Sequence, residues 1–141
     1  MRTINELDHA EAQKALEVIK LETLKRGKAV VIAVADSHGE LITLLRMDGA
    51  PFTSIQIAAN KAYTAARERK PSHLIGQAAR DPQDGFDISY YGDPKIVGWS
   101  GGLPVIVAGA VVGAIGVSGL AGEEDVELAQ LGSDAIVSSL K

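Results

Sequence analysis

A glycine-interrupted apolar run near the carboxyl end constrains the fold of this chain more than any other feature. Residues 103–117 are almost wholly apolar, but Pro104 and three glycines interrupt them. The run is shorter than the roughly 20 residues that a membrane-spanning helix needs, and glycine disfavours a helix interior. A tight turn at Gly109 would instead fold the run back on itself. The run therefore predicts a β-hairpin of two strands, 103–108 and 110–117.

Length and composition fit one globular domain over residues 1–141. The chain is 46% hydrophobic and 23% charged, an ordinary globular balance. It has no cysteine, which excludes disulfides, a thiolate nucleophile and cysteine-ligated metals. The first residues lack the apolar core of a signal peptide, so we expect a cytoplasmic protein. The net charge of −4 has the wrong sign for binding nucleic acid. No apolar run is long enough to span a bilayer. We therefore expect neither a nucleic acid nor a membrane as a partner.

The amino-terminal part predicts an amphipathic helix over residues 8–26. Asp8 and Glu11 have the spacing of a capping box, and Gly27 suits the position after the last turn. Residues at helical spacing predict the face that packs on the core: Ala12, Ala15, Leu16, Ile19, Thr23 and Leu24.

A β-hairpin is expected next. Residues 28–35 are nearly all apolar, which predicts a strand covered on both faces. The sequence 36–39 has Asp at its first position and Gly at its last, as in a turn, and 40–46 returns as the second strand.

The middle of the chain predicts a second helix and a shorter third one. Thr53 and Gln56 have capping-box spacing, and this helix would end near Lys70, before a proline. Its apolar face is rich in alanine: Ile55, Ala58, Ala59, Ala62, Ala65 and Ala66. Ser72 is the expected cap of a helix that continues to Ala79.

After a long irregular segment at 80–95, residues 96–99 predict another short strand, and a last helix begins at the acidic residues 123–125. The order is α-β-β-α-(α)-β-β-β-α. Because hairpins dominate and no βαβ alternation occurs, we expect an α+β fold with a five-stranded antiparallel sheet and flanking helices.

Several runs occur together in a recognisable order. They are Val34-Ala35-Asp36, Arg46-Met47-Asp48-Gly49-Ala50, Asn60-Lys61-Ala62-Tyr63-Thr64-Ala65, Gly101-Gly102-Leu103-Pro104-Val105 and Gly113-Ala114-Ile115-Gly116-Val117-Ser118-Gly119. Over about residues 8–140 the chain resembles the GlcG/HbpS family, which includes the C-terminal domain of PduO-type corrinoid adenosyltransferases. The resemblance implies a profilin-like sandwich and self-assembly to tetramers or octamers. It also implies haem or a corrinoid as ligand, because some members bind haem. Others accompany glycolate, glycerol or propanediol catabolism.

Haem would need an axial ligand, and without cysteine the histidines are the first candidates. His9 is expected to be a solvated residue at a helix start, which leaves His38 and His73 as candidate haem ligands. In this family the hairpin turn often reads Asp-Ala-Gly-Gly-His-Leu, whereas here the position of that histidine is occupied by Glu40. A surface role explains each histidine better than a ligand role does. No pair has metal-ligand spacing, so no metal site is predicted.

The glycine-rich run matches no phosphate-binding or dinucleotide motif, and close backbone packing explains its glycines. Only its exit, Ser118-Gly119 before an acidic helix start, is a candidate ligand contact, where backbone amides could face an anion.

Three further polar residues are candidates for a ligand-binding pocket. Arg46 and Lys61 could hold a carboxylate together, with Asp48 in the turn between them. The alternative is a structural network in which Asp48 caps the turn and Arg46 pairs with a carboxylate such as Asp36. Aromatic residues of the irregular region would wall the pocket: Tyr90, Tyr91 and Trp99.

Two functional hypotheses follow. The first is an oligomeric small-ligand-binding protein linked to a catabolic pathway. The second is a cofactor-free isomerase, hydratase or lyase that acts on a small organic acid held by Arg46 and Lys61. Lys61, Tyr90 or Tyr91 would then donate the proton. A purely structural assembly protein is a third alternative.

Overall fold

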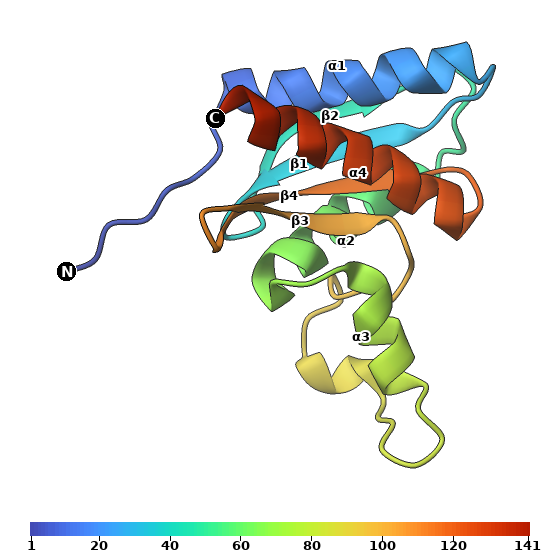
Figure 1. Cartoon of the computed structure of the whole chain (residues 1–141). Helices are drawn as coiled ribbons and strands as arrows, with labels where there is room; N and C mark the ends of the chain where they lie inside the picture. Colours follow the sequence, from blue (N-terminus) through green and yellow to red (C-terminus); the bar gives the residue numbers. More distant parts are fainter.

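A four-stranded antiparallel sheet organises the computed structural model, which describes residues 1–141 (Figure 1). Its strand order is β2-β1-β4-β3. The strands are β1 (Val31–Asp36), β2 (Leu41–Arg46), β3 (Gly102–Val107) and β4 (Ala110–Ser118). Both predicted hairpins form, because β1 pairs with β2 and β3 with β4, and the long connection between them brings β4 beside β1.

Helices cover both faces of this sheet. α1 (His9–Lys25) and α4 (Gly122–Ser139) lie side by side on one face, and α2 (Ser54–Glu68) lies on the other (Figure 1). Alternate residues of β1 point to the two layers, so that Ile32 packs under α1 and α4 while Ala33 packs under α2. The prediction of a strand covered on both faces is therefore confirmed. No helix combines the length and the apolar character needed to cross a membrane.

The first helix forms as predicted in all but one position. Asp8 and Glu11 exchange side-chain and backbone hydrogen bonds in a capping box, and Gly27 follows the helix with φ +70°. The predicted core residues are buried except Leu24, which is 57% exposed. Leu24 lies at the edge of the stripe, beyond the reach of the sheet.

Two predicted caps are wrong. Thr53 has helical φ and ψ, and its side chain makes no capping hydrogen bond. The first amides of the helix already have acceptors, because Ser54 donates to the carbonyl of Pro51 and Ile55 to that of Phe52. Ser72 is the first residue of α3 (Ser72–Ala79) rather than its cap. Its hydroxyl instead donates to the carbonyl of Trp99 and accepts from the amide of Gly102.

The fifth strand is also wrong. Residues 96–99 pair with no other strand, because helix side chains take their backbone groups. Thr64 donates to the carbonyl of Lys95 and accepts from the amide of Val97, at 3.1 and 3.0 Å. This segment, α3 and the short 3₁₀ turn η1 (Ile88–Tyr91) form a projection below the sheet (Figure 1). The segment joins α3 and α2 to the sheet without extending it.

The glycine-rich hairpin has two features that the sequence indicated. Ala108 and Gly109 both have positive φ, at 50° and 79°, as in a two-residue turn between antiparallel strands. Gly116 lies directly under α2, where an added Cβ would come within 2.0 Å of the Ala58 carbonyl oxygen. The absence of a side chain at Gly116 therefore lets helix and strand backbones touch.

Candidate functional site

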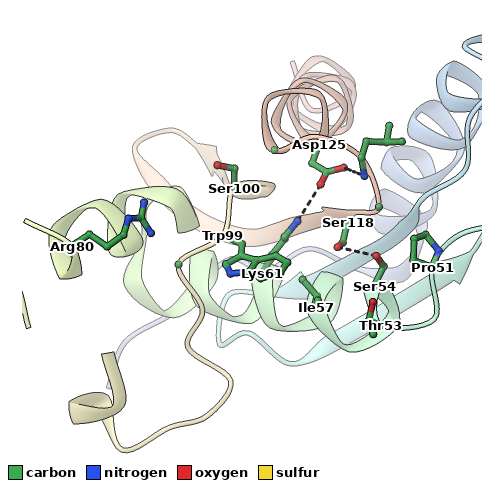
Figure 2. A pocket seen from close by; sticks show the side chains of 14 residues that line it. Pro51, Thr53, Ser54, Ile57, Lys61, Arg80, Trp99, Ser100, Ser118 and Asp125 are labelled. Carbon is green, nitrogen blue, oxygen red and sulfur yellow. Dashed lines mark hydrogen bonds and ion pairs between the residues drawn. The ribbon is translucent and has the colours of Figure 1, made fainter. Parts of the chain in front are cut away.

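A polar cleft opens where the start of α2, the segment 98–100 and the β4–α4 connection meet (Figure 2). Its volume is about 680 Å³. Few of its lining residues are hydrophobic. The complete lining consists of Pro51, Thr53, Ser54, Ile57, Lys61, Arg80, Gly98, Trp99, Ser100, Ser118, Gly119, Leu120, Gly122 and Asp125. Each wall comes from a different part of the sequence, so the cleft exists only in the folded chain.

The floor of the cleft contains a buried ion pair. Lys61 is 2% exposed, and its Nζ donates to the carbonyl of Val117 at 2.8 Å and to Oδ2 of Asp125 at 3.2 Å. An ammonium group has three hydrogens, so these two contacts leave one for the cleft. Buried charges that face a cleft are typical of functional sites.

Burial acts on both partners of this pair. It lowers the pKa of Lys61, and Asp125 opposes that change through its charge and hydrogen bond. Burial likewise raises the pKa of Asp125, against the effect of Lys61 and of the backbone amides of Gly119 and Leu120. Removal from water disfavours the charged form of each group. The environment therefore moves both groups toward their neutral forms.

Hydroxyl groups and one further cation complete the cleft. Ser118 on β4 donates to the hydroxyl of Ser54 at the start of α2, at 3.1 Å. Arg80, after α3, lies on the side of Trp99 away from the ion pair (Figure 2). With Lys61 and Arg80 positive and Asp125 negative, the lining carries one net positive charge. That balance favours an anionic ligand.

Only part of the predicted site comes together here. Lys61, Trp99, Ser118 and Gly119 line the cleft, whereas Arg46 and Asp48 do not. The pocket predicted for Arg46 and Lys61 is therefore wrong.

The reason lies in the place of Arg46 on the sheet. It ends β2, two strands away from Ser118, and its guanidinium lies over the Phe52 ring, 5.4 Å from the centroid. The alternative ion pair of Arg46 with Asp36 is also wrong, because the salt bridges of the structure include neither residue.

The two predicted wall tyrosines lie outside the cleft, on η1. Tyr90 is 82% exposed. Tyr91 packs against Phe86 with ring centroids 6.0 Å apart, and its hydrogen bond to Glu68 raises its pKa to about 12. They do not wall the pocket, because η1 lies in the projection below the sheet (Figure 1) and contributes no residue to the cleft.

Sequence reasoning missed Arg80, Ser54, Ser100 and Asp125 as site residues. From the sequence, Asp125 is only a favourable acid in the first turn of the last helix. The available signal was its position six residues after Gly119, at the helix start that follows the Gly116-Val117-Ser118-Gly119 run. Arg80 gave none, because its position depends on how α3 folds back.

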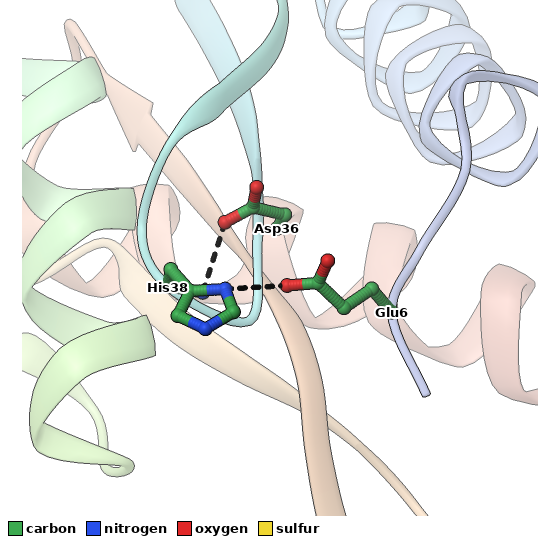
Figure 3. Close-up of side chains that lie close together, drawn as sticks. All are labelled: Glu6, Asp36 and His38. Carbon is green, nitrogen blue, oxygen red and sulfur yellow. Dashed lines mark hydrogen bonds and ion pairs between the residues drawn. The ribbon is translucent and has the colours of Figure 1, made fainter. Parts of the chain in front are cut away.

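The histidines lie away from the cleft. His9 is exposed in the first turn of α1. His38, at the tip of the β1–β2 hairpin, places Nδ1 2.7 Å from a carboxylate oxygen of Glu6, while Asp36 accepts from its amide (Figure 3). This group fastens the amino-terminal segment to the hairpin. His73 on α3 has a buried Nδ1 without a hydrogen-bond partner.

Comparisons with known proteins agree with this architecture. The model of the family described as "Haem degrading protein HbpS-like" matches residues 7–134. An uncharacterised 15.0 kDa protein from the dhaT-dhaS intergenic region of Citrobacter freundii is 38% identical over 89% of this chain and 88% of its own. Protein GlcG of Escherichia coli is 35% identical over 69% of each chain.

Two solved structures have the same fold. Klebsiella pneumoniae protein ORFY superposes with a TM-score of 0.91 at 31% identity, over 100% of this chain and 97% of its own. The structure described as a PduOC–haem complex gives 0.84 at 24% identity, over 92% and 94%. The molecule is thus an α+β domain with helices on both faces of an antiparallel sheet. It belongs to the HbpS-like family, as its resemblance to GlcG and HbpS indicated.

Proposed function

We propose that this chain is a small-ligand-binding protein and that its ligand is a small organic acid held in the cleft. The observation that supports this most is the buried amine of Lys61, which has one hydrogen free for a ligand oxygen. Arg80 and the hydroxyls of Ser54 and Ser100 supply further donors. Arg80 here takes the role that the sequence suggested for Arg46, because a guanidinium binds a carboxylate through two parallel hydrogen bonds.

Haem does not fit this cleft. Its lining residues include no histidine, methionine, tyrosine or cysteine, the side chains that act as axial ligands. The cleft therefore cannot hold haem through its iron in the usual way.

Haem at another surface is the second candidate function, favoured by the family description and by the PduOC–haem complex. His38 suits an axial ligand better than His73. Its Nδ1 faces Glu6, and a carboxylate at one ring nitrogen commonly orients the other toward a metal. Haem titration should then give a Soret band that His38→Ala removes and His73→Ala retains. A band that survives both changes would exclude His38 and His73 as the ligands, and a corrinoid can be tested in the same titration.

Self-assembly, a link to a catabolic pathway and a cytoplasmic location stay part of this proposal. The exposed apolar side chains Leu41, Phe52 and Ile106 support self-association. Elution as a monomer from a size-exclusion column would contradict it.

The organic-acid ligand can be tested by thermal shift. Lactate should raise the melting temperature, because binding only the folded state stabilises it. Arg80→Gln should weaken binding about tenfold or more, the loss expected for a charged hydrogen bond. Arg46→Gln is the matched control, an arginine outside the cleft, and should bind normally. If Arg46→Gln abolishes the shift and Arg80→Gln does not, the ligand occupies another site.

A further inference from the structure

Lys61 differs from every other lysine of the chain. It is the only lysine among the buried residues, whereas Lys25, Lys28 and Lys70 are exposed. Its amine lies at the base of an open cleft and beside a carboxyl group. An amine held in this way is a nucleophile whenever it is uncharged.

We propose that the Lys61 amine forms a reversible imine with a small aldehyde or 2-oxo acid bound in the cleft. This inference rests on the proposed ligand site and adds a reactive carbonyl to the class of ligand. The cleft of about 680 Å³ has room for a three-carbon acid above Nζ. Nζ would meet the carbonyl carbon of a 2-oxo acid, and its carboxylate would lie toward the hydroxyl groups of Ser54 and Ser118, on the same side of Trp99 as Nζ (Figure 2).

The neighbouring carboxyl group supplies the proton transfers. Moving one proton from the ammonium of Lys61 to Asp125, across 3.2 Å, gives a free amine and a carboxylic acid without changing the net charge. Burial favours this neutral pair, since it lowers the pKa of Lys61 and raises that of Asp125. After this transfer the amine still donates to the carbonyl of Val117, which holds Nζ at the base of the cleft while rotation about the Cε–Nζ bond turns its lone pair from Asp125 to the ligand.

The steps balance without an oxidant, reductant or further reactant. The nitrogen lone pair forms a bond to the carbonyl carbon, and the carbonyl oxygen takes the proton of Asp125. Asp125 then recovers a proton from the nitrogen and returns it to the hydroxyl group. The carbon–oxygen bond breaks, water leaves and the carbon–nitrogen double bond forms. Amine and carbonyl compound thus give imine and water, and hydrolysis reverses the reaction.

The test is reductive trapping on the unmodified protein. We would incubate it with pyruvate and cyanoborohydride at neutral pH and map adducts by peptide mass spectrometry. Burial lowers the pKa of Lys61, which raises the uncharged fraction of its amine at neutral pH. Lys61 should therefore carry more adduct than any exposed lysine, Lys25 and Lys70 included. Lys61→Arg keeps the positive charge, cannot form the imine, and should lose this adduct.

The outcomes separate this inference from the proposed function. Lactate resembles pyruvate but has no carbonyl group to trap. If lactate raises the melting temperature while pyruvate modifies only exposed lysines, the ligand site stands and the imine is excluded. If neither acid shifts the melting temperature and no adduct forms on Lys61, both proposals fail. An adduct on Lys61 that Asp125→Asn does not slow would refute the proton transfers.

Discussion

The two faces of the sheet are packed in different ways. Under α1 and α4 the core consists of large aliphatic side chains such as Ile115 and Leu128, both fully buried. Under α2 it consists mainly of small residues, with Ala58 and Ala62 of the helix over Gly116 of β4. The first face therefore removes far more apolar surface from water for each residue that contributes.

The difference teaches what each face does. Where side chains are large, their volume sets the distance between layers. Where they are small, backbones touch, and an added Cβ at Gly102 would come within 2.3 Å of the Lys61 carbonyl oxygen. Close contact positions α2 on β3 and β4, and this places the Lys61 amine beside Val117. One face thus supplies stability, and the other sets the geometry of the cleft.

The largest effect is expected from breaking the ion pair under α2. Lys61→Met should destabilise the protein by about 3–5 kcal/mol, because Asp125 is left as an uncompensated buried charge. Urea denaturation measures the change. The double variant Lys61→Met/Asp125→Leu removes both charges, so it should be less destabilised than either single variant. Fully additive losses would show that the two groups do not interact.

A cavity in the aliphatic face should affect stability alone. Leu128→Ala should lower the free energy of unfolding by about 3 kcal/mol, since it removes buried methyl groups and leaves a void. Lactate should still raise its melting temperature by the same amount as in the wild-type protein. A lost lactate shift in the folded variant would mean that the aliphatic face also shapes the cleft.

Crowding the small-residue face should affect stability and binding together. Gly116→Ala should destabilise by about 2 kcal/mol, because the new methyl group collides with backbone that cannot easily move aside. The displaced α2 carries Lys61 with it, so lactate should also bind more weakly. Gly109→Ala is the control. Its Cβ would touch nothing, and its positive φ should reduce stability by about 1 kcal/mol without changing binding. Equal behaviour of the two variants would refute the close-packing argument.

Local sequence patterns predicted most of the fold. The Asp8–Glu11 capping box and the Ala108–Gly109 turn depend on a few neighbouring residues, so their patterns can be interpreted directly. That Ser72 does not cap α3 could not be predicted, because its hydroxyl forms hydrogen bonds with residues about 30 positions away. The supposed fifth strand at 96–99 was wrong for the same reason.

The site was only half predictable. Lys61 and Ser118 stood out as polar residues within apolar surroundings, and the structure brings them to one cleft. Arg46 stood out equally, yet the strand order β2-β1-β4 places it two strands away from Ser118. Arg80 lies in a region without periodicity. The order of strands in a sheet and the path of an irregular segment are long-range properties that a single sequence does not encode locally.

The smallest effect on stability is expected at the rim of the cleft. Trp99 is 62% exposed, and its tie to Ser72 uses its backbone carbonyl. Trp99→Ala should therefore change the free energy of unfolding by less than about 0.5 kcal/mol. It should still weaken lactate binding several-fold, because the indole walls the cleft beside Lys61, and Trp99→Phe should recover part of the affinity. Trp99 is the only tryptophan, so its fluorescence follows binding directly in the wild-type protein. If Trp99→Ala instead lowered the free energy of unfolding by several kcal/mol, Trp99 would contribute to the core. The separation between residues that stabilise the fold and residues that shape the cleft would then fail at Trp99.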